Sequence, residues 1–165
     1  MAKKDFRALI NNYSAQVLNT AMRILGDTHK AQDVHQEVFL EIWRRWHKYD
    51  GRTNWKAYLY RTTVRKAIRF AKRSRTDRPL GQLEYADTKE KPDVPLVTTE
   101  LQQKLAECLA RFPKRQAEVF VLSRMEGLKA EKIAELLGCS QKTVRVHLHR
   151  AMRRLARELS EYLIK

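Results

Sequence analysis

The chain has 165 residues, of which 34 are Lys or Arg and 19 are Asp or Glu, so its formal net charge is +15. This length allows one ordinary domain or two small ones, and it excludes a large enzyme scaffold. With 43% hydrophobic residues, 32% charged residues, five Gly and four Pro, the composition predicts helical cores and argues against both a disordered chain and a turn-rich β protein.

Residues 1–73 predict a first domain of three helices. Apolar residues recur every three or four positions from Phe6 to Ile24, and a Gly-Asp pair ends this pattern. Asp27 or Thr28 can cap a second helix. Its expected buried stripe consists of Val34, Val38, Ile42 and Trp46, broadened by Ala31, Phe39 and Trp43. A third helix is expected from near Asn54 to about residue 73.

A linker is predicted over residues 74–98, where the helical periodicity disappears. The segment contains three prolines, and residues 74–100 hold four basic and six acidic side chains. A structureless stretch of this length is unusual within a compact domain and common between two domains. We therefore expect a flexible acidic linker, and an all-α fold of two small helical domains.

The second domain is expected over residues 99–165. One amphipathic helix includes Leu101 and Leu109, and Pro113 opens another that Gly127 ends. A short helix over residues 130–137, a tight turn at Gly138 and a long helix capped by Ser140 then follow. Apolar residues on the long helix, expected to be buried, are Val144, Leu148, Met152 and Leu155. This pattern is typical of a helix-turn-helix, although a plain helical hairpin has similar spacing and remains an alternative.

The start of the long helix carries the side chains that would enter a DNA major groove. They are Ser140, Gln141, Lys142, Thr143, Arg145, Val146, His149 and Arg150. Arg can bind two acceptors on guanine, Gln can pair with adenine, and Lys or Thr can hold phosphate. His147 and His149 are about 200° apart around a helix, so they cannot share one metal ion from one face. No other histidine has a matching set of ligands, and we expect no metal and no cofactor.

The positive charge is concentrated in two blocks. Residues 39–73 hold 11 basic and two acidic side chains, and residues 101–165 hold 14 basic and seven acidic ones. Residues 139–157 contain six basic residues and no acid. A solvated surface normally intersperses both signs, so two acid-depleted blocks favour a polyanionic partner, with nucleic acid ahead of a membrane surface.

The location of the protein follows from what the sequence lacks. No uncharged run approaches the roughly 18 residues of a membrane span, and the N-terminus has no uninterrupted apolar segment typical of a secretory signal. We therefore expect a cytoplasmic protein with no membrane insertion. The two cysteines, Cys108 and Cys139, match no metal or redox spacing and are expected to be reduced and partly buried.

Five motifs together resemble the extracytoplasmic-function sigma factors, small bacterial subunits that direct RNA polymerase to promoters. They are RILGD at 23–27, AQDVHQEVFLEIW at 31–43, WKAYLYR at 55–61, FPKRQAEVFVL at 112–122 and GLKAEKIAELLGCSQKTVRVHLHRAMRRL at 127–155. The resemblance implies a sigma region 2 domain over residues 1–73 and a sigma region 4 domain over residues 99–165. It also implies two partners, core RNA polymerase with its β and β′ subunits, and promoter DNA.

The resemblance assigns roles to three groups of residues. Polymerase would contact Asp33, Gln36, Glu37 and Phe39, which match the family's DVxQExF motif. The minus-ten element would be held by Trp55, Tyr58, Tyr60, Arg61, Arg65 and Arg69, because aromatic rings stack on unpaired bases while arginines follow the backbone. The helix-turn-helix residues named above would read the minus-thirty-five element. For Trp55, packing in the core is an equal alternative to base contact.

The chain departs from the family at two places. Arg65 and Arg69 stand where the family most often has Asn and Asp, and the loop between Tyr49 and Trp55 is slightly short. Extra cations should favour contact with the DNA backbone. The acidic linker would occupy a basic channel of the polymerase, and an anti-sigma factor that masks both domains is an expectation from the family alone.

Two other classes of protein stay open from the residues alone. A free-standing helix-turn-helix regulator would bind an operator as a dimer, but residues 1–73 resemble neither a dimer interface nor a ligand domain. A nucleic-acid enzyme could use Asp33 and Glu37 with a divalent metal, yet no third carboxylate is expected on the same helix face. We therefore expect a specificity subunit without catalytic activity of its own.

Overall fold

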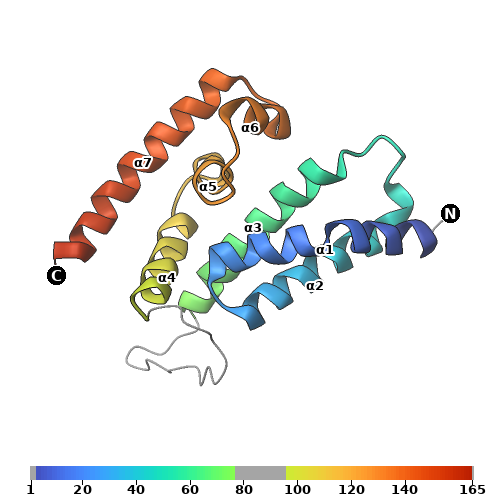
Figure 1. Ribbon diagram of the computed structural model, residues 1–165, viewed down its shortest axis with the longest axis horizontal. Helices are drawn as coiled ribbons and strands as arrows, with labels where there is room; N and C mark the ends of the chain where they lie inside the picture. The colour runs from blue at the N-terminus through green and yellow to red at the C-terminus, as the bar shows by residue number, and fades with distance from the viewer. Residues whose placement is uncertain (1–2, 77–95, 165) are drawn as a thin grey trace.

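The computed structural model describes residues 3–76 and 96–164, and every regular element in these two stretches is a helix (Figure 1). The first stretch forms α1 (Lys3–Leu25), α2 (Thr28–Arg44), the short 3-10 helix η1 (Trp46–Lys48) and α3 (Trp55–Thr76). The second forms α4 (Leu96–Ala110), α5 (Lys114–Phe120), the π-helical turn η2 (Val121–Met125), α6 (Ala130–Leu137) and α7 (Gln141–Ile164). The predicted all-α fold is confirmed. Most of the predicted linker, residues 77–95, lies outside the described residues.

The three N-terminal helices pack around the apolar stripes that the sequence predicts. Asp27 caps α2 through its carboxylate, which accepts a hydrogen bond from the backbone N–H of Lys30 at 3.1 Å. Val34, Val38 and Ile42 on α2 are fully buried. Trp43, expected in the same stripe, is instead 40% exposed. Its ring meets Phe6, in the first turns of α1, at 4.8 Å between centroids, and this half-buried partner covers only part of it.

The C-terminal helices surround α5, which is buried over most of its length. Five consecutive residues of this helix, from Gln116 to Phe120, are inaccessible to solvent or nearly so. In Figure 1, α5 is seen almost end-on between α3 and α7. On α7, Val144, Ala151 and Leu155 are buried, whereas Met152 is 39% exposed. The expected burial of Met152 is therefore wrong, because Ala151 lies closer to the line that joins Val144 and Leu155.

The largest apolar core includes residues from both halves of the chain. Buried side chains of α1, α2 and α3 belong to the same cluster as Leu109, Phe112 and Phe120. A smaller cluster, which includes Val119, Ile133 and Val144, holds the helix-turn-helix together. In neither described stretch is any helix both long and apolar enough to cross a membrane.

The end of α1 depends on a side chain from the C-terminal half. The last carbonyl groups of a helix have no partner within it. Here the Nε2 of Gln102, on α4, donates to the carbonyl oxygens of Met22 and Arg23 at 3.3 and 2.8 Å. Gly26 ends the helix with φ of +66°, and a Cβ built there would lie 2.7 Å from the Oε1 of Gln102. This junction therefore needs both the left-handed backbone and the absence of a side chain.

Replacement of Gly26 by Ala should destabilise the protein. The substitution places a side chain in the left-handed region and pushes Gln102 from its carbonyl partners, so we expect the free energy of unfolding to fall by about 1–3 kcal/mol. Urea denaturation followed by circular dichroism measures the change. Gly51→Ala is the matched control, because no atom lies within 4 Å of a Cβ built at Gly51. Equal stability of the Gly26→Ala and Gly51→Ala proteins would contradict this account of the junction.

His35 should make the stability of the N-terminal helices depend on pH. Its Nε2 lies 2.7 Å from the Ser14 hydroxyl, and burial lowers the pKa of His35 below its usual value. Below the unfolded pKa of about 6.5, the unfolded chain takes up a proton that the folded chain resists, so stability falls as the pH drops toward the folded pKa.

We expect wild-type protein to lose unfolding free energy between about pH 7.5 and pH 5.5, and His35→Gln to lose less over the same interval. Urea titrations at the two pH values give the comparison. His29→Gln, at an exposed position of the same helix, is the control and should keep the wild-type dependence. The same pH dependence in the His35→Gln protein would exclude His35 as the source.

Candidate nucleic-acid interface

All eight side chains expected to face DNA at the start of α7 and its cap are exposed. The turn before them has the predicted geometry, with Gly138 in the left-handed region at φ of +67°. The Ser140 Oγ accepts a hydrogen bond from the backbone N–H of Thr143 at 3.1 Å and lies 2.9 Å from its Oγ1. The Ser140 hydroxyl therefore caps α7 and the Thr143 hydroxyl lies against it, while the longer side chains beyond them are exposed.

Arginine and glutamine are adjacent on this surface. The Nη2 of Arg145 lies 3.4 Å from the Oε1 of Gln141, one helical turn away. Val146, the apolar residue that follows Arg145, is 39% exposed. A guanidinium, an amide and an apolar group together can meet the acceptors, donors and methyl groups of a major groove.

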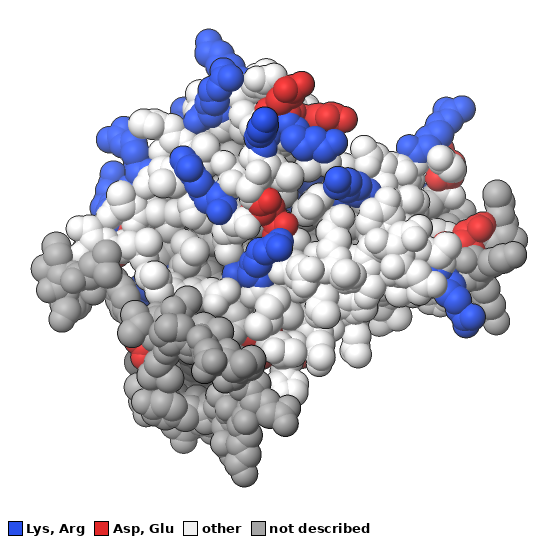
Figure 2. All heavy atoms as spheres, viewed as in Figure 1, with Lys and Arg blue, Asp and Glu red and all other residues white. Residues whose placement is uncertain are grey.

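The surface of α7 is strongly basic. Six basic residues and no acid occur from residue 139 to residue 157, and Figure 2 shows Lys and Arg side chains along the edge of the molecule that α7 forms. The first acid on the helix, Glu158, is bound by the Arg111 guanidinium, which lowers the pKa of this carboxylate. The basic surface is thus left with little internal neutralisation.

The aromatic residues at the start of α3 belong to a packed cluster. Trp55 stacks on Trp46 with ring centroids 5.6 Å apart, and it meets Tyr49 edge-on at 4.8 Å. The hydroxyl groups of Tyr58 and Tyr49 lie 2.8 Å apart. Burial, together with this hydrogen bond, raises the pKa of Tyr49. Both Trp55 and Tyr58 remain partly exposed, so one face of the cluster stays open to solvent.

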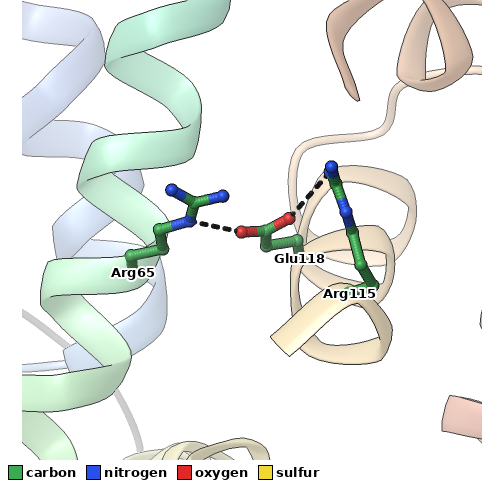
Figure 3. A network of polar contacts seen from close by, with 3 residues as sticks. All are labelled: Arg65, Arg115 and Glu118. Atoms are coloured by element: carbon green, nitrogen blue, oxygen red, sulfur yellow. Dashed lines mark hydrogen bonds and ion pairs between the residues drawn. The ribbon is translucent and has the colours of Figure 1, made fainter. Parts of the chain in front are cut away.

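Two other residues expected at the minus-ten element, Tyr60 and Arg65, contact the C-terminal helices, although the Arg65 side chain stays 41% exposed. Tyr60 packs against the cluster that holds the helix-turn-helix, and burial, with the nearby Glu126 carboxylate, raises its pKa. The Nε of Arg65 donates to the Oε1 of Glu118 on α5 at 2.7 Å, as Figure 3 shows. Arg61 is half-buried, and Arg69 is exposed at the side of a cleft between α3 and α5.

The residues expected to contact polymerase lie along α2. Asp33, Gln36 and Glu37 are exposed, whereas Phe39 is only 5% exposed and belongs to the main core. Next to them a groove of about 670 Å³ runs between α1 and α2. Its lining includes Gln36 and the exposed apolar side chains Leu40 and Trp43, which are 46% and 40% exposed.

The described stretches hold no cluster that resembles a metal site, and the buried Cys108 thiol is not activated. Residues 3–76 and 96–164 contain no group of three His, Cys, Asp or Glu arranged to hold a metal ion. Burial raises the pKa of Cys108 to about 11, and the hydrogen bond to Glu158 acts in the same direction. The Cys108 thiol is therefore protonated at neutral pH and a poor nucleophile.

Sequence reasoning missed two buried acids that join the halves of the chain. Glu118 is 1% exposed and accepts from Arg65 and also from Arg115, whose Nη1 lies 3.3 Å from its Oε2. The Glu126 side chain, 4% exposed, binds the Nη1 of Arg23 on α1 at 2.7 Å. The one available signal for Glu118 is its position between apolar residues in a short helix, which alone does not distinguish a buried acid from a solvated one.

Comparison with known proteins places both halves in one family. Residues 9–76 match the description of sigma-70 region 2, and residues 102–155 match sigma-70 region 4. The chain is 31% identical to the ECF RNA polymerase sigma factor SigL of Mycobacterium tuberculosis, over 94% of this chain and 89% of SigL. It is 24% identical to the RNA polymerase sigma-H factor of Pseudomonas aeruginosa, over 98% and 89% of the two chains.

A solved structure shares the fold. The chain is similar to CnrH, solved in complex with the cytosolic domain of CnrY, with a TM-score of 0.57 and 21% identity over 96% of this chain and 89% of CnrH. Together with the two matched regions and their order, these findings show that the chain belongs to the extracytoplasmic-function group of the sigma-70 family.

Proposed function

We propose that this sigma factor binds core RNA polymerase and directs initiation at promoters whose minus-thirty-five element is read by α7. The observation that carries the proposal is the exposed, acid-free surface at the start of α7, built on a helix-turn-helix with a capped entry. Its N-terminal position on the helix is the one that enters a major groove in this motif. The proposed region 4 domain comprises residues 99–165.

The minus-ten element is assigned to α3 and the aromatic cluster before it, within a proposed region 2 domain of residues 1–73. Trp55 and Tyr58 are partly exposed at the open side of the cluster, where an unpaired base can stack. Arg61, Arg65 and Arg69 recur at intervals of four along α3, so they can follow one strand of the DNA backbone. Tyr60 and Arg65 become available to DNA only after their contacts with the C-terminal helices are released.

Polymerase is assigned to the surface of α2. Asp33, Gln36 and Glu37 supply polar groups, and Leu40 and Trp43 add apolar area beside the α1–α2 groove. Exposed apolar groups rimmed by polar ones are typical of protein interfaces. Phe39 supports this surface from below, since it is buried against the core.

We further infer that the protein acts in the cytoplasm, as a binding subunit without catalysis of its own. The described helices supply no metal cluster, and Asp33 and Glu37 have no third acid beside them for a metal-dependent reaction. Masking by an anti-sigma factor is part of the proposal. The structural relative CnrH was solved in complex with a partner. The two basic blocks of this chain, residues 39–73 and 101–165, offer surfaces that such a partner would cover.

Run-off transcription with purified core polymerase tests this function. We expect specific initiation on a subset of a diverse promoter library when the protein is added, and none from core polymerase alone. Absence of specific initiation across the library would overturn the proposal. Sequence-specific DNA binding without polymerase would favour a free-standing regulator, and chelator-sensitive cleavage would favour a nuclease.

Arg145→Ala should weaken discrimination at the minus-thirty-five element. If its guanidinium binds two acceptors of one guanine, the loss is about 1–3 kcal/mol for promoters with that base and much less for promoters without it. Competition between promoter variants in the run-off assay measures the difference. The control is Arg153→Ala, which removes the same charge about 12 Å farther along the helix. An equal loss on all promoters would place Arg145 on phosphate instead.

A further inference from the structure

The second half of α7 carries a stripe of four exposed arginines beside a cleft of about 550 Å³. The residues that line this cleft, from α5 and α7, are Gln116, Arg150, Arg153, Arg154, Arg157 and Glu158. Because the arginines are three or four residues apart, they lie within an arc of about 100° and over about 10 Å of the helix. The cleft therefore has guanidinium groups along one whole side.

Folding alone does not account for this concentration of positive charge. Among the side chains that the structure describes, none of the four arginines has an ion-pair partner. The acid that lines the cleft, Glu158, is already bound by Arg111. Like charges three or four residues apart destabilise a helix. An anion in the cleft would relieve the repulsion between them.

One of the four guanidinium groups is oriented by an aromatic ring. The Cζ of Arg154 lies 5.9 Å from the centroid of Phe112. A cation over the face of a ring is attracted to it, so this contact restricts the directions in which the Arg154 side chain can point. A binding group that is held in place before the ligand arrives loses less conformational entropy on binding.

A buried amide lines the same cleft. Gln116 is 7% exposed, and its Oε1 has no hydrogen-bond partner among the described residues. Buried polar atoms are almost always paired, so an unpaired one calls for an explanation. A hydroxyl group of a bound molecule can donate to this oxygen, and the amide turned by 180° can donate to an oxygen of the ligand instead. The cleft thus offers a polar contact besides its charges.

These groups fit a small anion with several phosphates. A guanidinium binds two phosphate oxygens at once, and each phosphate group carries about one to two negative charges, so four arginines match a chain of two or three phosphates. A concave site of several hundred Å³ has the size of a small-molecule site. Duplex DNA also supplies phosphate, but on a convex surface that a cleft of this volume does not enclose.

We propose that the cleft between α5 and α7 binds a small polyphosphate anion, either a nucleoside polyphosphate or inorganic polyphosphate. Arg150 is also among the residues proposed to read the minus-thirty-five element. A bound anion would therefore weaken DNA binding, and DNA would weaken binding of the anion by the same factor. This coupling rests on the proposed function, whereas occupation of the cleft does not.

Isothermal titration calorimetry of the full chain tests the site, without magnesium, polymerase or DNA. We expect one equivalent of sodium tripolyphosphate to bind saturably, and orthophosphate to bind at least tenfold more weakly because it reaches fewer guanidinium groups. Arg154→Gln and Arg157→Gln should each weaken tripolyphosphate binding about tenfold, as expected when a charge-assisted hydrogen bond is lost. Arg44→Gln, which removes an exposed charge on α2, is the matched control and should bind as wild type does.

A variant of the acid in the cleft should act in the opposite direction. Glu158→Gln removes a negative charge from the lining and frees Arg111, so the affinity for tripolyphosphate should rise several-fold. Circular dichroism shows whether each variant keeps its helices. If loss of the contact with Phe112 unfolds Arg154→Gln, the exposed Arg157 decides.

ATP as a second probe distinguishes the two sources of phosphate. Tighter binding of ATP than of tripolyphosphate assigns the cleft to nucleotides, and equal or weaker binding assigns it to the phosphate chain alone.

Three results would overturn the site. Equal weakening in Arg44→Gln and in the two cleft variants would show only a general attraction to positive charge, and unchanged affinity in both cleft variants would place the anion elsewhere. If the cleft variants lose affinity only for a labelled duplex without promoter sequence, measured by fluorescence anisotropy, the arginines serve the DNA backbone. Because the titrations contain neither promoter nor polymerase, their result is independent of whether the protein initiates transcription.

Discussion

A buried carboxylate, Glu118, ties α5 to α3 where the two halves of this protein meet. Glu118 is 1% exposed, and the residues next to it on α5, from Gln116 to Phe120, are buried as well. Water therefore cannot solvate its charge. Arg115 reaches it from the preceding turn, but a carboxylate has several acceptor positions, and Arg65 fills another. The contact of α5 with α3 therefore includes a charged side chain from the other half of the chain.

The long C-terminal helix, α7, packs against its neighbours with one stripe of residues and exposes the others. Val144, Ala151 and Leu155 fall within an arc of about 40° at 100° per residue, and they attach the helix to its neighbours. The exposed side chains at its start occupy the remaining arc. Because the buried stripe is narrow and contains a small alanine, α7 can carry many long basic side chains and still pack closely. The side chains proposed to read DNA and the side chains that pack α7 against its neighbours therefore occupy different positions.

Local chemistry could be predicted from sequence better than contacts between distant segments. Caps at Asp27 and Ser140 and the turn at Gly138 depend on neighbouring backbone atoms alone, so residue type and spacing were enough. The burial of Met152 was expected from its apolar character, although its angle, about 80° from Val144, already placed it off the stripe. The pairing of Arg65 with Glu118 joins residues 53 positions apart. No periodicity encodes such a pair, because it depends on how whole helices dock.

The contact between α3 and α5 engages part of the first proposed DNA-binding surface and leaves the second, at the start of α7, exposed. When two such surfaces are joined in one chain, binding of the first raises the effective concentration of the second. The resulting gain in affinity applies to nonspecific DNA as well as to promoters. With α3 held against α5, the free chain presents the α7 surface, while Arg65 is neutralised by an internal acid.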